Sequence, residues 1–191
     1  MRLSVRARAT RLVVAFGLAA GLVLPVAGHA AAATNVLKVG TTQDLDSLNP
    51  FQTAYLVGYE IFTLNYDMLV GFGPNNETVP GYAESWTQST DGLQWTFKMH
   101  AGNTWSDGQP ATAEDARWTL QYYLDAQKKG KSLGYGYLDP YVLNAAITKV
   151  EAPDATTLVV TTSRKNDRIL QMYLPILPEH VWGKLDYKKI G

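Results

Sequence analysis

Strict alternation of apolar and polar positions predicts a strand over residues 93–99, preceded by a tight turn. The apolar side chains of this stretch share one face, because successive side chains of a strand point to opposite faces. Asp91-Gly92 is a dipeptide that tolerates the positive backbone angles of a hairpin turn. A second hairpin is predicted from residues 147–152 to residues 157–162, since the latter segment is rich in β-branched side chains.

Apolar residues spaced three and four apart predict helices on either side of the first hairpin. One such stretch covers residues 56–64, and a longer one covers residues 113–127. Thr112 and Asp115 form a start that resembles a capping box, because each side chain can satisfy a backbone N–H at the helix end. The remaining predicted elements are strands over residues 36–40 and 68–72 and helices over residues 168–174 and from Pro178 onward.

The first 33 residues differ in composition from the rest and predict a secretory signal peptide. A basic start without acidic residues precedes an apolar run over residues 12–24 and a stretch of small residues. The alternative, a transmembrane anchor, needs about 20 apolar residues, which is longer than this run. Cleavage after Ala30, Ala32 or Ala33 is compatible with the pattern. We therefore expect a periplasmic protein.

Charge and cysteine content narrow the classes of function. All 17 acidic residues but only 13 of the 17 basic ones follow the leader, so the mature piece carries a net charge of −4. This balance does not favour nucleic-acid binding, which requires a basic face. The absence of cysteine removes a thiol nucleophile and a lipid-modified cysteine after the leader. We expect a protein without a lipid anchor and without a nucleic-acid partner.

No motif of catalytic or metal-binding residues occurs in the sequence. His100 and His180 are the histidines that follow the leader, and they are far apart in the chain, whereas a metal site needs three or four convergent ligands. Asp91, Asp107 and Asp115 are each interpreted as structural residues of a turn or a cap. We predict no catalytic residue, no metal and no cofactor. A secreted hydrolase with a converging carboxylate pair is retained as a distant alternative.

An ordered series of short segments lies between residues 83 and 116. These segments are Ala83-Glu84-Ser85-Trp86, Asp91-Gly92-Leu93-Gln94-Trp95-Thr96-Phe97-Lys98, Ala101-Gly102, Trp105-Ser106-Asp107-Gly108-Gln109-Pro110 and Thr112-Ala113-Glu114-Asp115-Ala116. The series resembles the signature of the family 5 extracellular solute-binding proteins, which include dipeptide-, oligopeptide- and nickel-binding members. Residues 46–50 and 176–182 are similar to two flanking family segments. His100 and Glu179 depart from the pattern, since the family mostly carries basic residues there.

The resemblance, which covers nearly all of residues 35–190, implies a mixed α/β fold like that of class II periplasmic binding proteins. Family members have two lobes that close on a ligand around a hinge. The present chain would correspond to the first lobe, and the second lobe would be absent, so the chain is expected to be truncated. Residues 34–81 and 168–191 would form the lobe core, with residues 82–167 as an inserted α+β subdomain.

The resemblance also implies a binding function and not an enzyme. The expected activity is reversible capture of a peptide-like solute by a monomer, followed by delivery to an ABC permease complex in the inner membrane. An oligosaccharide or a nickel chelate is the alternative ligand. Two loops are expected to face the ligand, although the tyrosines of the second are equally compatible with loop packing alone. The expected contact residues are Thr53, Ala54, Tyr55, Leu56 and Val57 in the first loop and Tyr135, Gly136 and Tyr137 in the second.

Overall fold

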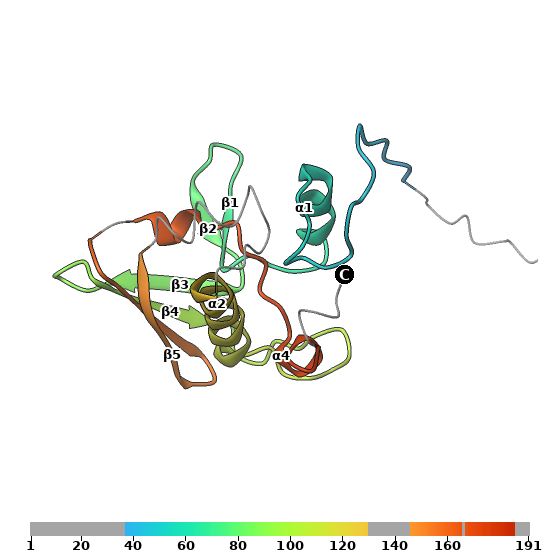
Figure 1. Cartoon of the computed structure of the whole chain (residues 1–191). Coiled ribbons are helices and arrows are strands. Elements are labelled where there is room, and N and C mark those ends of the chain that lie inside the picture. The colour runs from blue at the N-terminus through green and yellow to red at the C-terminus, as the bar shows by residue number, and fades with distance from the viewer. Residues whose placement is uncertain (1–36, 130–145, 166, 186–191) are drawn as a thin grey trace, which may run out of the picture. The chain divides into compact units, whose positions relative to one another are not determined.

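The computed structural model describes residues 37–129, 146–165 and 167–185. The chain divides into two units, residues 1–39 and 40–191, and every element named below belongs to the second unit. The elements appear in chain order along the coloured ribbon of Figure 1. They are α1 (Leu56–Phe62), β1 (Val70–Phe72), β2 (Thr78–Pro80), β3 (Ala83–Gln88), β4 (Gln94–Met99), α2 (Ala113–Lys128), β5 (Ile147–Asp154), β6 (Thr157–Thr162), the 3₁₀ turn η1 (Arg168–Gln171) and α4 (Glu179–Trp182).

The two predicted hairpins combine into one four-stranded antiparallel sheet with the strand order β3-β4-β6-β5. Gly92 has a φ of 73° in the turn between β3 and β4, which confirms the predicted positive backbone angle that glycine adopts without steric cost. The Asp91 carboxylate stabilises the same turn by accepting hydrogen bonds from the Ser89 hydroxyl at 2.6 Å and the Leu93 N–H at 3.0 Å. On β4, Trp95 and Phe97 are buried, as the alternating pattern predicts.

Helix α2 packs against β5 and β6 and covers one face of the sheet (Figure 1). Its N-terminus has the predicted capping box between Thr112 and Asp115. Leu120 and Tyr123, on the face toward the sheet, are fully buried and share one hydrophobic cluster with Phe97. The helix is therefore held by its apolar face and by a capped first turn.

The segment after the sheet corrects one prediction. Residues 168–174 were expected to form a helix, but only the short 3₁₀ turn η1 forms, and Met172 is extended with φ −76° and ψ 112°. Pro175 disfavours helical backbone in the residue before it. The extended segment then runs beside residues 67–68, with the Ile176 N–H bonded to the Asp67 carbonyl at 2.9 Å.

A second correction concerns the predicted strand over residues 36–40. The described residues 37–40 form no strand, and Leu37 and Val39 are 86% and 74% exposed. An apolar segment becomes a strand when a neighbouring strand accepts its hydrogen bonds, and local sequence does not supply that neighbour. The strand expected over residues 68–72 is confirmed in part as β1, with Met68 in an isolated bridge to Pro175.

All four strands of the larger sheet lie within residues 82–167. The buried cluster nevertheless joins residues from each expected division, among them Phe51, Phe97 and Ile176. The division into residues 34–81, 82–167 and 168–191 therefore stays a prediction.

Candidate functional site

The first expected ligand loop is tied to Asp46 through both oxygens of one carboxylate. The Thr53 hydroxyl donates a hydrogen bond to Asp46 Oδ1, and the Ala54 N–H donates one to Asp46 Oδ2, each at 2.6 Å. Burial would raise the pKa of Asp46, but these hydrogen bonds outweigh it, and the pKa lies below the ordinary value. Asp46 therefore accepts both bonds as an anion.

A tight turn precedes the loop, and its conformation is determined by the local sequence. The Asn49 carbonyl accepts a hydrogen bond from the Gln52 N–H at 2.9 Å, with Pro50 at the position of the turn that proline favours. The Asn49 side chain accepts a further bond from the Phe51 N–H at 2.9 Å. These bonds fix the direction in which the chain enters the loop.

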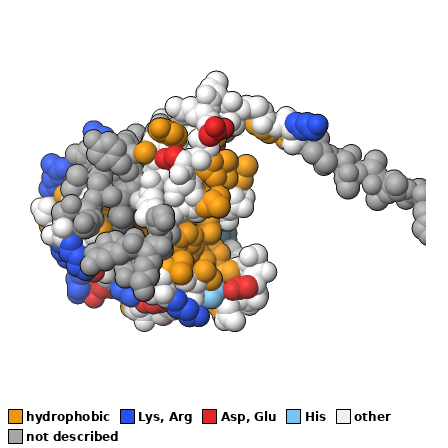
Figure 2. Space-filling view, turned by 45° about the vertical axis from the view of Figure 1, so that its right-hand side comes forward, with side chains coloured by type: hydrophobic (Ala, Val, Ile, Leu, Met, Phe, Trp, Pro, Cys, Tyr) orange, Lys and Arg blue, Asp and Glu red, His pale blue; other side chains and the backbone are white. Residues whose placement is uncertain are grey.

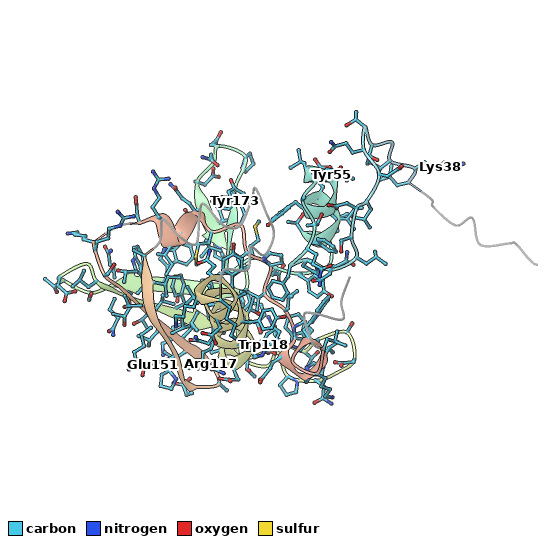
Figure 3. The ribbon with its side chains drawn as sticks, in the orientation of Figure 1. Lys38, Tyr55, Arg117, Trp118, Glu151 and Tyr173 are labelled. Atoms are coloured by element: carbon cyan, nitrogen blue, oxygen red, sulfur yellow. The ribbon has the colours of Figure 1, made fainter. Side chains whose placement is uncertain are left out.

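Phe51 anchors this turn on aromatic side chains from two helices. Its ring lies 4.9 Å from that of Tyr122 and 6.4 Å from each of the rings of Trp118 and Trp182. Trp118 and Tyr122 of α2 stack on each other at 5.1 Å. Figure 3 shows Trp118 on the side of α2 that is turned toward α4. The base of the loop is thus packed against both helices.

The structure separates the residues of the first loop into inward and outward positions. Thr53 and Val57 are buried, whereas Ala54 is exposed and Tyr55 and Leu56 are 47% and 49% exposed. Figure 3 shows Tyr55 at the end of α1. The outward residues are available to a ligand, and the inward ones hold the loop. The second expected loop, with Tyr135, Gly136 and Tyr137, lies outside the described residues.

A groove of about 920 Å³ lies at the other end of α1, and it was not predicted from the sequence. Tyr82 and Trp105 stack along it with ring centres 5.8 Å apart. Figure 2 shows hydrophobic side chains gathered on one face beside a histidine and an acidic side chain. The groove is lined by Tyr82 and by parts of three segments that are distant in the sequence, namely residues 63–67, residues 102–111 and residues 178–182.

One buried carboxylate joins the elements around this groove. Asp115 accepts hydrogen bonds from the Thr112 N–H at 2.9 Å, the Trp105 Nε1–H at 3.2 Å and the Glu179 N–H at 2.9 Å. Burial and the nearby charge of Asp115 raise the pKa of Tyr82, whose hydroxyl bonds to the Thr112 carbonyl at 2.9 Å. The structural role that the sequence assigned to Asp115 is confirmed.

At the rim of the groove, His180 Nε2 lies 2.6 Å from Asp107 Oδ2. This contact joins α4 to the turn at residues 105–108. The hydrogen bond with His180 is the main reason why the pKa of Asp107 is below its ordinary value. His100 forms a comparable half-exposed pair, with Nδ1 3.3 Å from the Glu84 carboxylate. Both histidines therefore have acidic partners at the surface.

The described part of the chain lacks the features of a metal site and of a membrane-spanning helix. No group of three or more histidine, cysteine or acidic side chains there is arranged to hold a metal ion. Among the same residues, no helix combines the length and the apolar character that crossing a membrane requires.

Residues 77–190 match the family model described as bacterial extracellular solute-binding proteins, family 5 Middle. A probable ABC transporter-binding protein of Deinococcus radiodurans is 31% identical over 145 residues, which cover 73% of this chain and 23% of that protein. Di/tripeptide-binding protein 4 of Pseudomonas aeruginosa is 31% identical over 109 residues, or 52% of this chain and 20% of that protein. The chain therefore spans about a quarter of the length of these relatives.

The fold is also similar to that of solved binding proteins. The crystal structure of Haemophilus influenzae OppA in complex with the peptide RPPGFSPFR superposes with a TM-score of 0.62 at 24% identity. The superposition covers 76% of this chain and 31% of that one. The expected mixed α/β fold of this class of binding protein is confirmed, for one part of the longer structure.

Proposed function

The chain belongs to the bacterial extracellular solute-binding proteins of family 5, and from this premise we propose that it is part of the receptor of an ABC importer. The receptor, a monomer, captures a peptide-like solute reversibly in the periplasm. It then delivers the solute to a permease in the inner membrane. The observation that carries the proposal is the family match over residues 77–190, together with relatives named as di/tripeptide-binding proteins.

The described loop suits one wall of such a site. Its base is packed on two helices and tied to Asp46, while Ala54, Tyr55 and Leu56 are exposed. Binding sites are commonly carried by loops on a rigid scaffold. We propose that backbone hydrogen bonds across the cleft hold the main chain of a peptide with little regard to its side chains.

Capture then depends on differential affinity and not on covalent chemistry. A ligand that contacts both lobes only in the closed state shifts the population toward that state by hinge motion. In this proposal, the loop at residues 53–57 supplies ligand contacts from one lobe.

The test is isothermal titration calorimetry on the complete gene product that contains this chain. The ligands are tri-alanine, maltotriose and a nickel–histidine complex, with free alanine as the control. We expect tri-alanine to bind with a dissociation constant of about 10 µM or tighter, which corresponds to roughly −7 kcal/mol. Binding of the sugar alone or of the nickel complex alone would contradict peptide capture while leaving a role in solute binding.

The predicted leader is part of the same proposal. Residues 1–33 lie in the part of the chain that the structure does not describe. N-terminal sequencing of the exported protein is expected to begin after Ala30, Ala32 or Ala33. A protein that keeps Met1 at the membrane would contradict cleavage.

A further inference from the structure

We infer that Asp46 is the positioning residue for solute capture, and that its carboxylate holds the exposed residues 54–56 in the conformation that binds. This inference rests on the proposed function. Asp46 itself has an exposed side chain and is not one of the residues expected to contact the ligand. It acts through Thr53 and Ala54.

The geometry at Asp46 favours a specific clamp over an incidental surface contact. Its two oxygens bind neighbouring residues at 2.6 Å each, one through a side-chain hydroxyl and one through a backbone N–H. Hydrogen bonds that involve an ionised group are roughly twice as strong as neutral ones. The donor hydroxyl belongs to Thr53, which is fully buried, so the clamp joins the surface to the interior.

The Thr53 hydroxyl of this clamp lies in a closely packed position. A Cβ atom at Gly58 would collide with the Thr53 hydroxyl, so glycine at this position gives that hydroxyl its space. On the other side, the turn at Asn49 is anchored by Phe51 and the helices beneath it. The loop is therefore held at its base by packing and at its exposed part by Asp46.

The effect on binding follows from the population of the competent loop conformation. The observed dissociation constant equals the intrinsic one divided by the fraction of molecules that are competent to bind. Residues 54 and 55 lie outside helices and strands, and the Ala54 N–H donates its hydrogen bond to Asp46. If loss of the clamp reduces the competent fraction to about a tenth, affinity falls about tenfold.

The main variant is Asp46→Asn, measured in the complete gene product with tri-alanine as the probe. An asparagine side chain accepts at one atom only, because its NH₂ group is a donor, so one of the two bonds is lost. The matched control is Asp44→Asn, which removes the same charge from an exposed position in the same segment. Titrations are made well below the melting temperature, so that every variant is folded.

A second pair of variants separates positioning from general stability. Thr53→Val removes the hydroxyl and keeps the shape, and Thr53→Ser keeps the hydroxyl. We expect Thr53→Val to weaken binding about tenfold and Thr53→Ser to recover most of that loss. Amide hydrogen exchange at residue 54 is expected to accelerate in Asp46→Asn and Thr53→Val, with melting temperatures within a few degrees of wild type.

The outcomes decide the inference. Weaker binding in Asp46→Asn but not in Asp44→Asn, with faster exchange at residue 54, supports positioning. Equal affinity of wild type and Asp46→Asn overturns it, and so does a loss of affinity that merely follows the melting temperature through all four variants. If wild type itself binds no tri-alanine, the proposed peptide capture fails at that first titration, and the inference falls with it.

Discussion

Replacement of Asp115 by alanine is expected to destabilise the protein strongly, because this carboxylate joins three elements. It is 5% exposed and accepts hydrogen bonds from backbone or indole donors of the α2 start, the turn at Trp105 and the α4 start. Each donor left without a partner costs about 1–3 kcal/mol when it is buried. Water that enters the site would satisfy some of these donors and lower their total cost. We therefore expect a loss of about 3–5 kcal/mol in the free energy of unfolding.

The assay is urea denaturation of the protein, followed by tryptophan fluorescence, with a thermal melt in parallel. For a protein of 150–250 residues, each kcal/mol shifts the melting temperature by about 2–4 °C, so we expect a fall of about 6–20 °C. The control is Asp125→Ala on the same helix, where the half-exposed carboxylate bonds to Gln121 and Lys128. Exposed pairs of this kind contribute about 0–1 kcal/mol.

Asp115→Asn provides the sharper test of the geometry. The amide oxygen can accept at the position of Oδ2, but the NH₂ group then faces the Glu179 N–H, where Oδ1 accepts in the wild type. We therefore expect a smaller destabilisation than in Asp115→Ala, with hydrogen exchange accelerated first in α4. The reasoning is refuted if Asp115→Ala costs no more than Asp125→Ala, or if exchange in α4 is unchanged.

The remaining predictions concern the loop and the groove. Gly58→Ala is expected to destabilise the protein by about 1–3 kcal/mol, since its Cβ would collide with the buried Thr53 hydroxyl. The control, Gly40→Ala, has open space around it and should change the melting temperature little. The pKa of Asp107 is lowered by its bond to the histidine of α4, so the stabilisation from this bond is present above the ordinary carboxyl pKa of about 3.9 and is lost as pH falls through the lower folded value. Carbon-13 NMR titration of the Asp107 carboxyl checks this, and a midpoint at or above the ordinary carboxyl pKa would contradict it. Leu56→Ala is expected to weaken tri-alanine binding several-fold in calorimetry. Leu48→Ala is expected to leave binding unchanged, although both side chains are exposed, Leu56 by 49% and Leu48 by 79%. Equal effects of the two substitutions would show that the loop does not contact the ligand.

The sequence predicted the elements that depend on neighbouring residues. Alternation over residues 93–99 and the Asp91-Gly92 turn appear in the structure as β4 and its hairpin, and Thr112 with Asp115 appears as a capping box. These features are local, since a turn or a cap is decided by a few consecutive side chains. The strand expected over residues 36–40 was wrong because a strand needs a neighbour that local sequence does not supply. The helix expected over residues 168–174 was wrong because the segment is extended before Pro175 and then runs beside residues 67–68.

The candidate site was predictable to a smaller degree. The resemblance named residues 53–57, and the structure shows three of them exposed, but whether they contact a ligand stays a prediction. The link from Asp46 to Thr53 had no signal beyond two polar residues near a turn. The groove had no sequence signal, because it is lined by Tyr82 and by parts of three distant segments, residues 63–67, 102–111 and 178–182.

The sequence by itself thus determined the hairpins, the capped helix and the family, since periodicity and turn chemistry act over a few residues. The tertiary structure alone decided that Asp115 connects α2 to α4 and that Asp46 ties the loop. The physical reason is that a carboxylate accepts hydrogen bonds from whichever donors folding brings near it. Those donors lie up to 64 residues away along the chain, as for Asp115 and Glu179.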